Sequence, residues 1–389
     1  MSPETLPDFS AEALRIIPLA RAETIPARWY TDPRFHAFDG EAVFMRSWQY
    51  IGHEGLIPHA GDYVLATVAG NPVIVVRGHE EEIRAYYNVC RHRGGPLATQ
   101  ERGNVRMLQC QYHGWTYRLD GCLRGVPRFD RTELFDKADY GLIPVAVAIW
   151  QGLLFVNLSD RPLPLAELME GIEARIAPLD LRHLSFYRRV WYEVACNWKV
   201  YVDNYLEGYH LPLVHPELCD ALDYRSYATE TARYYSLQYS PLRAGEGVYG
   251  EGEAFYYYAF PNTMLNILPD RLQMNRVLPV SHDRTRVLFD YYYADVASAG
   301  AIRKIEEDLD FSDRVQQEDI EICEHVQLGL QSRAYDRGRF SVECEQGVYH
   351  FQCLLKEAYR LEYERQGHEA DLREVPEPPG GVGDVKASD

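Results

Sequence analysis

The chain has 389 residues, of which 46% are hydrophobic, and a formal net charge of −18. This length allows two or three domains with substantial cores, while so acidic a surface repels phosphate backbones and excludes nucleic acid as a partner. The first residues lack the basic and apolar regions of a secretion signal and no apolar run is long enough to span a membrane, so we expect a cytoplasmic protein without membrane contact.

The N-terminal part is predicted to be an arm followed by an all-β domain. Residues 1–45 contain short helical patterns and are expected to form an arm that packs on the second domain, at residues 166–368. Over residues 46–165 short apolar runs alternate with Gly and Pro turns. Residues 63–68 and 73–76, for example, flank Gly70-Asn71-Pro72, which is typical of a β-hairpin. This texture favours a small β-sandwich or barrel.

Longer elements are predicted over residues 166–368, which we expect to form a second domain. The patterns indicate helices at 163–179, 196–210, 301–332 and 349–364, with strands at 184–194 and between 230 and 296. This order predicts an α+β domain in which helices lie on an antiparallel sheet. The tail at 369–389 is polar and rich in Pro and Gly, so we expect it to be disordered.

Two cysteines and two histidines form the first chemical motif. Cys90 and His92 form C-x-H, and after seventeen residues Cys110 and His113 form C-x-x-H. A Rieske [2Fe–2S] cluster needs two Cys on one iron and two His on the other, so each loop supplies one of each. A zinc ribbon is an alternative, but zinc sites usually pair cysteine with cysteine, whereas each half of this motif pairs one Cys with one His. Four unrelated side chains are the other alternative, and eight cysteines without an export signal favour reduced thiols.

A second motif could bind a single metal ion. In the predicted helix at 196–210, Asp203, Glu207 and His210 have the spacing of one helical face, and Pro212 ends the helix so that His215 returns towards His210. Asp319 lies on the apolar stripe of the helix at 301–332, where a carboxylate is costly without a partner. Two His and one carboxylate form the facial triad of non-heme Fe(II) oxygenases. Alternatively, Asp319 faces an Arg or a helix N-terminus.

Both motifs resemble those of the Rieske non-heme iron oxygenases, over roughly residues 30–365. The stretches that carry the resemblance are YYNVCRHRGGPL, LQCQYHGWTYRLDG, NWKVYVDNYLEGYHLPLVHPEL and QQEDIEICEHVQLGLQS. The resemblance implies that Cys90, His92, Cys110 and His113 hold a [2Fe–2S] cluster, and that His210, His215 and Asp319 hold a mononuclear Fe(II). It assigns no ligand role to Cys122. Glu207 matches the carboxylate that bridges the two metal centres, although aromatic dioxygenases usually have Asp there.

The family also implies partners and a mechanism. Electrons are expected to come from a separate NAD(P)H-dependent flavin or iron–sulfur reductase. They are expected to cross, in a head-to-tail homotrimer, from His113 of one chain to Glu207 of the next. O2 is then used to hydroxylate or demethylate a small substrate.

The substrate is the least defined expectation. The segment with Glu207 and the stretch PNTMLNILPD are more similar to choline, carnitine and betaine monooxygenases than to ring dioxygenases. The faces of Tyr205, Tyr209, Tyr256 and Tyr258 are candidates for a cation–π cage around a quaternary ammonium group. Tyrosine is also a common strand residue, which argues against this interpretation. Alternatives are an aromatic (di)oxygenase, an aromatic O- or N-demethylase, and an electron-transfer protein without oxygenase activity.

Overall fold

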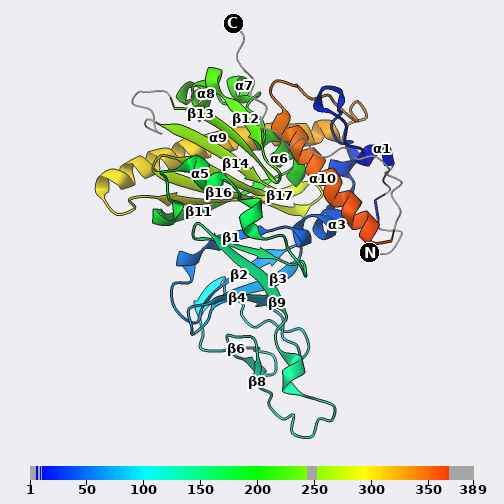
Figure 1. The fold of residues 1–389 in the computed structure, drawn as a ribbon, viewed down its shortest axis with the longest axis vertical. Helices are drawn as coiled ribbons and strands as arrows, with labels where there is room; N and C mark the ends of the chain where they lie inside the picture. Colours follow the sequence, from blue (N-terminus) through cyan, green and yellow to red (C-terminus); the bar gives the residue numbers. More distant parts are fainter. Residues whose placement is uncertain (1–5, 8, 10, 243–251, 368–389) are drawn as a thin grey trace. The chain divides into compact units, whose positions relative to one another are not determined.

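The structure is a computed structural model that describes residues 6, 7, 9, 11–242 and 252–367 (Figure 1). The chain forms two compact units. The first, here called the β unit, comprises Gly40–Glu167 and Asp180–Phe186. The second, the mixed unit, comprises the residues before Gly40, Leu168–Leu179, and those from Tyr187 onward. The predicted disorder at 369–389 concerns residues outside the described part.

The β unit contains two antiparallel sheets. The larger has the order β1-β10-β9-β4-β3-β2-β5 and the smaller the order β6-β7-β8. The strands are β1 (Gln49–His53), β2 (Asp62–Val68), β3 (Asn71–Arg77), β4 (Ile83–Tyr87), β5 (Arg102–Asn104), β6 (Leu108–Gln109), β7 (Thr116–Tyr117), β8 (Leu123–Gly125), β9 (Pro144–Trp150) and β10 (Leu153–Asn157).

Two tight turns set the register of the larger sheet. The β2–β3 turn has φ values of 46° at Ala69 and 76° at Gly70, and the β9–β10 turn has 50° at Gln151 and 78° at Gly152. Positive φ at both central residues is the geometry whose twist matches that of the flanking strands. One of the apolar clusters of this unit includes Cys90 and Cys110, so the cysteine loops are part of its core.

The mixed unit is built on a seven-stranded antiparallel sheet with the order β11-β17-β16-β15-β14-β13-β12. Its strands are β11 (Ser185–Val194), β12 (Ala228–Thr231), β13 (Tyr235–Pro241), β14 (Glu253–Ala259), β15 (Thr263–Leu268), β16 (Arg271–Ser281) and β17 (Arg284–Tyr293). The α-helices among the described residues are α1 (Ala11–Leu14), α2 (Arg28–Thr31), α3 (Pro33–Ala42), α4 (Leu165–Leu168), α5 (Ile172–Ile176), α6 (Trp198–Tyr205), α7 (Leu211–Val214), α8 (Pro216–Ala221), α9 (Ala299–Leu330) and α10 (Gln346–Arg365).

Helices cover this sheet and position the site. Helix α6 contacts β16 and α9, while α10 contacts β12, β13 and α6 (Figure 1). The N-terminal segment packs on the same unit, because α1 contacts α10 and α2 contacts α9. A cross-strand row on one face of the sheet consists of Gln238, Tyr256, Asn266 and Gln273, which are successive partners in β13, β14, β15 and β16. The predicted α+β fold class is confirmed.

Two predicted helices differ from the observed ones. The expected helix at 163–179 is instead the short α4 and α5, separated by Gly171 at a φ of 85°. The expected helix at 196–210 ends at Tyr205. Beyond it the chain turns at Gly208, where a Cβ atom would come within 2.6 Å of the Tyr227 ring. The close approach of Tyr227 therefore requires a residue without a side chain at this turn.

Candidate active site

The loops that carry Cys90 and Cys110 have the same backbone design. In each, a glycine donates its N–H to the cysteine carbonyl, Gly94 to Cys90 and Gly114 to Cys110, both at 3.0 Å. These glycines have φ values of 73° and 75°, a conformation that glycine adopts without strain. The two thiols are buried. The loops therefore bring both thiols to one buried place in the β unit.

The two histidines complete this donor set. The ring centroids of His92 and His113 are 4.7 Å apart, and the His92 ring stacks on Trp115 at 4.8 Å. Nδ1 of His92 is buried without a hydrogen-bond partner among the described residues. A Cβ atom on Gly95 would lie 2.8 Å from Sγ of Cys110, so only glycine allows the backbone so close to that sulfur. Two buried thiols and an unpartnered imidazole nitrogen fit the two kinds of iron ligand in a Rieske cluster.

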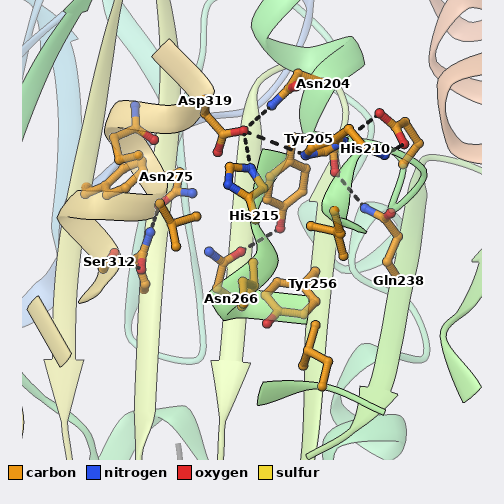
Figure 2. A pocket seen from close by; sticks show the side chains of 18 of the residues that line it. Asn204, Tyr205, His210, His215, Gln238, Tyr256, Asn266, Asn275, Ser312 and Asp319 are labelled. Atoms are coloured by element: carbon orange, nitrogen blue, oxygen red, sulfur yellow. Dashed lines mark hydrogen bonds and ion pairs between the residues drawn. The ribbon is translucent and has the colours of Figure 1, made fainter. Parts of the chain in front are cut away.

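A second donor set lies in the mixed unit. One potential ligand atom from each of His210, His215 and Asp319 lies within 4.8 Å of the others. His215 Nε2 is 2.9 Å from Asp319 Oδ1, and His210 Nε2 is 3.8 Å from the same oxygen. Helix α9 supplies the aspartate, while the histidines flank the short helix α7 (Figure 2). Two imidazoles and one carboxylate facing each other form the facial-triad donor set for non-heme iron.

Carboxylates orient both imidazoles of this triad. Nδ1 of His210 lies 2.7 Å from Glu207 Oε1, and Nδ1 of His215 lies 2.6 Å from Glu318 Oε2. Such contacts fix the tautomer of a ligating histidine and leave its other nitrogen for the metal. Burial would lower the pKa of His215, but the hydrogen bonds and charges of Asp319 and Glu318 raise it. Asn204 Nδ2 donates to Asp319 Oδ1 at 2.6 Å, which holds the third ligand in place.

Asp203 does not share the face of Glu207 and His210, in contrast to the expectation from spacing. The spacing argument fails because α6 ends at Tyr205, so helical periodicity no longer applies to the two later residues. Asp203 instead accepts hydrogen bonds from Tyr30 at 2.6 Å and from Gln352 at 3.1 Å. Burial raises the pKa of Asp203 to about 7. The Asp203 carboxyl therefore joins the N-terminal segment to α10 through hydrogen bonds in the core of the mixed unit.

A cavity of about 100 Å³ opens beside the triad. Of the tyrosines predicted as a substrate pocket, Tyr205 and Tyr256 line it (Figure 2). Tyr209 is instead 59% exposed, and Tyr258 is buried against Phe351 with its hydroxyl on the Pro261 carbonyl, so neither lines the cavity. Polar and tyrosine lining residues that the sequence analysis did not identify are Tyr201, Tyr227, Gln238, Asn266, Arg271, Gln273, Asn275, Ser312 and Gln316; the apolar lining consists of Leu211, Leu218, Leu222, Leu268, Phe289 and Val315.

Two of these lining residues, Ser312 and Gln316, could have been found from their spacing to Asp319 on α9. Ser312 and Gln316 precede Asp319 by seven and three residues, the spacing of one helical face. The lining residues on β13, β15 and β16 are brought together by sheet register, which a single sequence does not reveal; Tyr201 lies on α6, and Tyr227 precedes β12.

Comparison with known proteins identifies the class. A profile described as the Rieske [2Fe-2S] domain matches residues 47–140, and one described as the ring hydroxylating alpha subunit (catalytic domain) matches residues 181–361. Choline monooxygenase from Arabidopsis thaliana is 34% identical over 361 residues, which cover 89% of this chain and 85% of that protein. The chain belongs to the Rieske non-heme iron oxygenase family, as the predicted resemblance indicated, and is an oxygenase of the alpha-subunit type.

Other relatives agree with this assignment. The carnitine monooxygenase oxygenase subunit of Escherichia coli K12 is 31% identical, with 87% of this chain and 94% of that protein covered. The crystal structure of the quaternary ammonium Rieske monooxygenase CntA with L-carnitine superposes with a TM-score of 0.80 at 28% identity, covering 91% of this chain and all of that one. A naphthalene 1,2-dioxygenase from Rhodococcus shares the fold, with a TM-score of 0.71 at 19% identity over 86% of this chain and 94% of that one.

The family membership confirms the predicted cofactors, a [2Fe–2S] cluster and a mononuclear iron. The donor sets of the two units fit these two groups in number and chemistry. In the part of the chain that the structure describes, no helix combines the length and apolarity that crossing a bilayer requires.

Replacing Cys110 by Ser is expected to abolish the visible absorbance and the EPR signal of the cluster. A serine oxygen is a poor substitute for a soft thiolate, and the loop has no second sulfur to replace it. The matched control is Cys122→Ser, because Cys122 is an exposed thiol in the same unit. That variant should keep the full spectrum. Retention of the spectrum in Cys110→Ser would contradict the ligand assignment.

Proposed function

We propose that this chain is the terminal oxygenase of a multicomponent system that oxidises a small quaternary ammonium compound. The observation that carries the proposal is the row of tyrosines, Tyr205, Tyr227 and Tyr256, along the cavity beside the triad. Aromatic faces attract quaternary ammonium groups without needing a counter-charge. The relatives named as choline and carnitine monooxygenases support the same substrate class.

In this proposal each step of the reaction is assigned to named residues of the two donor sets and the cavity. His210, His215 and Asp319 hold the iron, and Asn204, Glu207 and Glu318 orient them. The bound iron supplies an open coordination position at which O2 is activated. Cys90, His92, Cys110 and His113 hold the cluster that stores an electron for that reaction. The cavity residues place a C–H bond of the substrate beside the iron and keep bulk water away.

Electron supply and assembly follow the same proposal. A separate NAD(P)H-dependent reductase reduces the cluster, and the chain acts as a homotrimer in which His113 of one subunit reaches Glu207 of the next. Two features support this route: the His113 side chain is exposed in the β unit, and the Glu207 carboxylate keeps 14% of its surface accessible beside His210. The cytoplasmic location inferred from the sequence stays a prediction.

A substrate panel tests the proposal directly. Purified holoenzyme with NADH and a generic reductase is offered choline, L-carnitine, γ-butyrobetaine, glycine betaine and several aromatic acids. We expect oxygen uptake coupled to product, or to formaldehyde where a methyl group is removed, only with quaternary ammonium compounds. The uncoupled background without substrate is the control. Coupled uptake with aromatic acids alone would replace the proposal by an aromatic hydroxylase or demethylase.

A further inference from the structure

Side-chain amides at one end of the cavity have their orientation set by a buried arginine. Arg271 forms an ion pair with Asp308, and its guanidinium also donates to Oε1 of Gln273. Because a guanidinium can only donate, the carbonyl oxygen of Gln273 must face it. The NH2 group of Gln273 then donates to Oδ1 of Asn275 at 2.8 Å. This chain of bonds leaves the NH2 group of Asn275, a cavity-lining residue, as a donor at the cavity.

Helix α9 contributes a second donor to the same end. Oε1 of Gln316 accepts a hydrogen bond from the Tyr201 hydroxyl at 2.7 Å. Its Nε2 group is buried and has no hydrogen-bond partner among the described residues, although Gln316 lines the cavity. A buried donor without a partner is costly, and a ligand atom in the adjoining cavity that accepted this hydrogen bond would remove the cost. Gln316 precedes the metal-binding Asp319 by three residues, a rise of about 4.5 Å along the helix.

The donors and the tyrosines lie on different sides of the triad. In Figure 2, Asn275 and Ser312 lie on one side of the His215 imidazole, and Tyr205 and Tyr256 lie towards the other. Ser312 belongs to the donor side because its hydroxyl donates to Gln273 at 3.2 Å. Tyr227 joins the side of Tyr205 and Tyr256, because its hydroxyl donates to Gln238, the cross-strand partner of Tyr256. Gln316 joins the side of Asn275 and Ser312, because it follows Ser312 by one turn of α9. The cavity thus has an aromatic side and a donor side.

We infer that the donor side binds a carboxylate, so that the substrate is a zwitterion with a quaternary ammonium group at one end and a carboxylate at the other. This inference rests on the proposed function and narrows it. A carboxylate only accepts hydrogen bonds and can satisfy the Asn275 and Gln316 donors together. An alcohol such as choline can also accept from both amides, but its own O–H then needs an acceptor, and the carbonyl oxygens of Gln273 and Asn275 already accept hydrogen bonds. It also brings no negative charge to strengthen the two bonds.

Two isosteric variants test the subsite by turning a donor into an acceptor. Gln316→Glu keeps an oxygen for Tyr201 and replaces the NH2 group by a second oxygen; Asn275→Asp makes the same change from the sheet. The matched control is Gln317→Glu, which adds the same charge on the adjacent, exposed residue of α9. Dissociation constants for γ-butyrobetaine and for its uncharged primary amide are measured by anaerobic calorimetry on the iron-loaded holoenzyme. The quantity compared is the ratio of the two constants.

We expect the wild-type protein to bind the acid more tightly than the amide. The preference should fall by about 10- to 100-fold in Gln316→Glu and in Asn275→Asp, because a charged hydrogen bond is exchanged for repulsion. Gln317→Glu should keep the wild-type ratio. Equal binding of acid and amide by the wild type, or an unchanged ratio in both variants, would overturn the carboxylate subsite and leave the proposed function intact. Failure to bind either ligand, and choline as well, would overturn the proposed function itself.

Discussion

Asp319→Ala is expected to lose the mononuclear iron and all measurable turnover while it keeps the spectrum of the cluster. Asp319 Oδ1 faces both His215 and His210, so its removal leaves two neutral imidazoles and no anionic ligand for the metal. Replacing a residue that only supports a metal ligand usually lowers activity by about 10- to 100-fold, and the loss in Asp319→Ala should be larger. Iron analysis should fall from about three atoms per chain to about two, the two of the cluster.

Variants of the supporting residues show whether the effect belongs to the metal. Asn204→Ala removes only the donor that holds Asp319, and Glu318→Gln alters only the partner of His215 Nδ1. Both should weaken iron binding by about 10- to 100-fold and recover turnover when iron is added in excess. Asp319→Ala should not recover. If Asp319→Ala kept its iron, or lost the cluster spectrum instead, the division of ligands between the two centres would be wrong.

The two ligand sets could be predicted from the sequence because short segments carry their chemistry. Cys90 with His92, and Cys110 with His113, lie within a few residues of each other, so local loop geometry alone brings each pair together. Asp319 could be identified because an acidic residue on an apolar helical stripe needs a partner. In the structure, potential ligand atoms of His210, His215 and Asp319 lie within 4.8 Å of one another.

The surroundings of the metal could not be predicted from local pattern. Helical periodicity placed Asp203 beside Glu207, but the helix stops at Tyr205, and the following turn at Gly208 lies against the Tyr227 ring. Tyr258 has the same strand face as Tyr256 and yet packs against Phe351 of α10. Such outcomes depend on which helix covers each part of a sheet, and that information is not local.

The role of the cavity amides also could not be predicted from the sequence. Asn266 and Gln273 are cross-strand partners, but in the sequence they look like any polar residue of a strand. What makes Asn275 a donor at the cavity is the bond from Gln273, which is oriented by Arg271. Hydrogen-bond direction is a property of a connected network, so only the assembled structure reveals it.

Glu207 has two sets of contacts, and they define opposing expectations for its replacement by Gln. Oε1 lies 2.7 Å from His210 Nδ1, while Oε2 accepts hydrogen bonds from the backbone N–H groups of Tyr209 and His210. A carboxylate can accept from all these donors and from a further imidazole at once. A glutamine has one acceptor oxygen, so its NH2 group must face either the backbone donors or the imidazole. If Glu207 only stabilises this turn, its replacement should change the stability of the protein modestly and leave electron transfer unaffected. If Glu207 bridges the metal centres, its replacement should slow electron transfer.

We therefore expect Glu207→Gln to retain both metal centres and the trimer, and to slow cluster reoxidation by about two orders of magnitude. The measurement is single-turnover kinetics with pre-reduced enzyme, substrate and O2, with iron content and oligomeric mass determined on the same samples. Glu217→Gln is the control, because this glutamate is exposed on the nearby α8 and pairs with Arg314. It should reoxidise at the wild-type rate. Normal reoxidation in Glu207→Gln, with a stability change within about 0.5 kcal/mol, would show that the carboxylate only caps its own turn. Slow reoxidation with the cluster and the mononuclear iron both present would show that electron transfer between the two centres is the step that Glu207 controls.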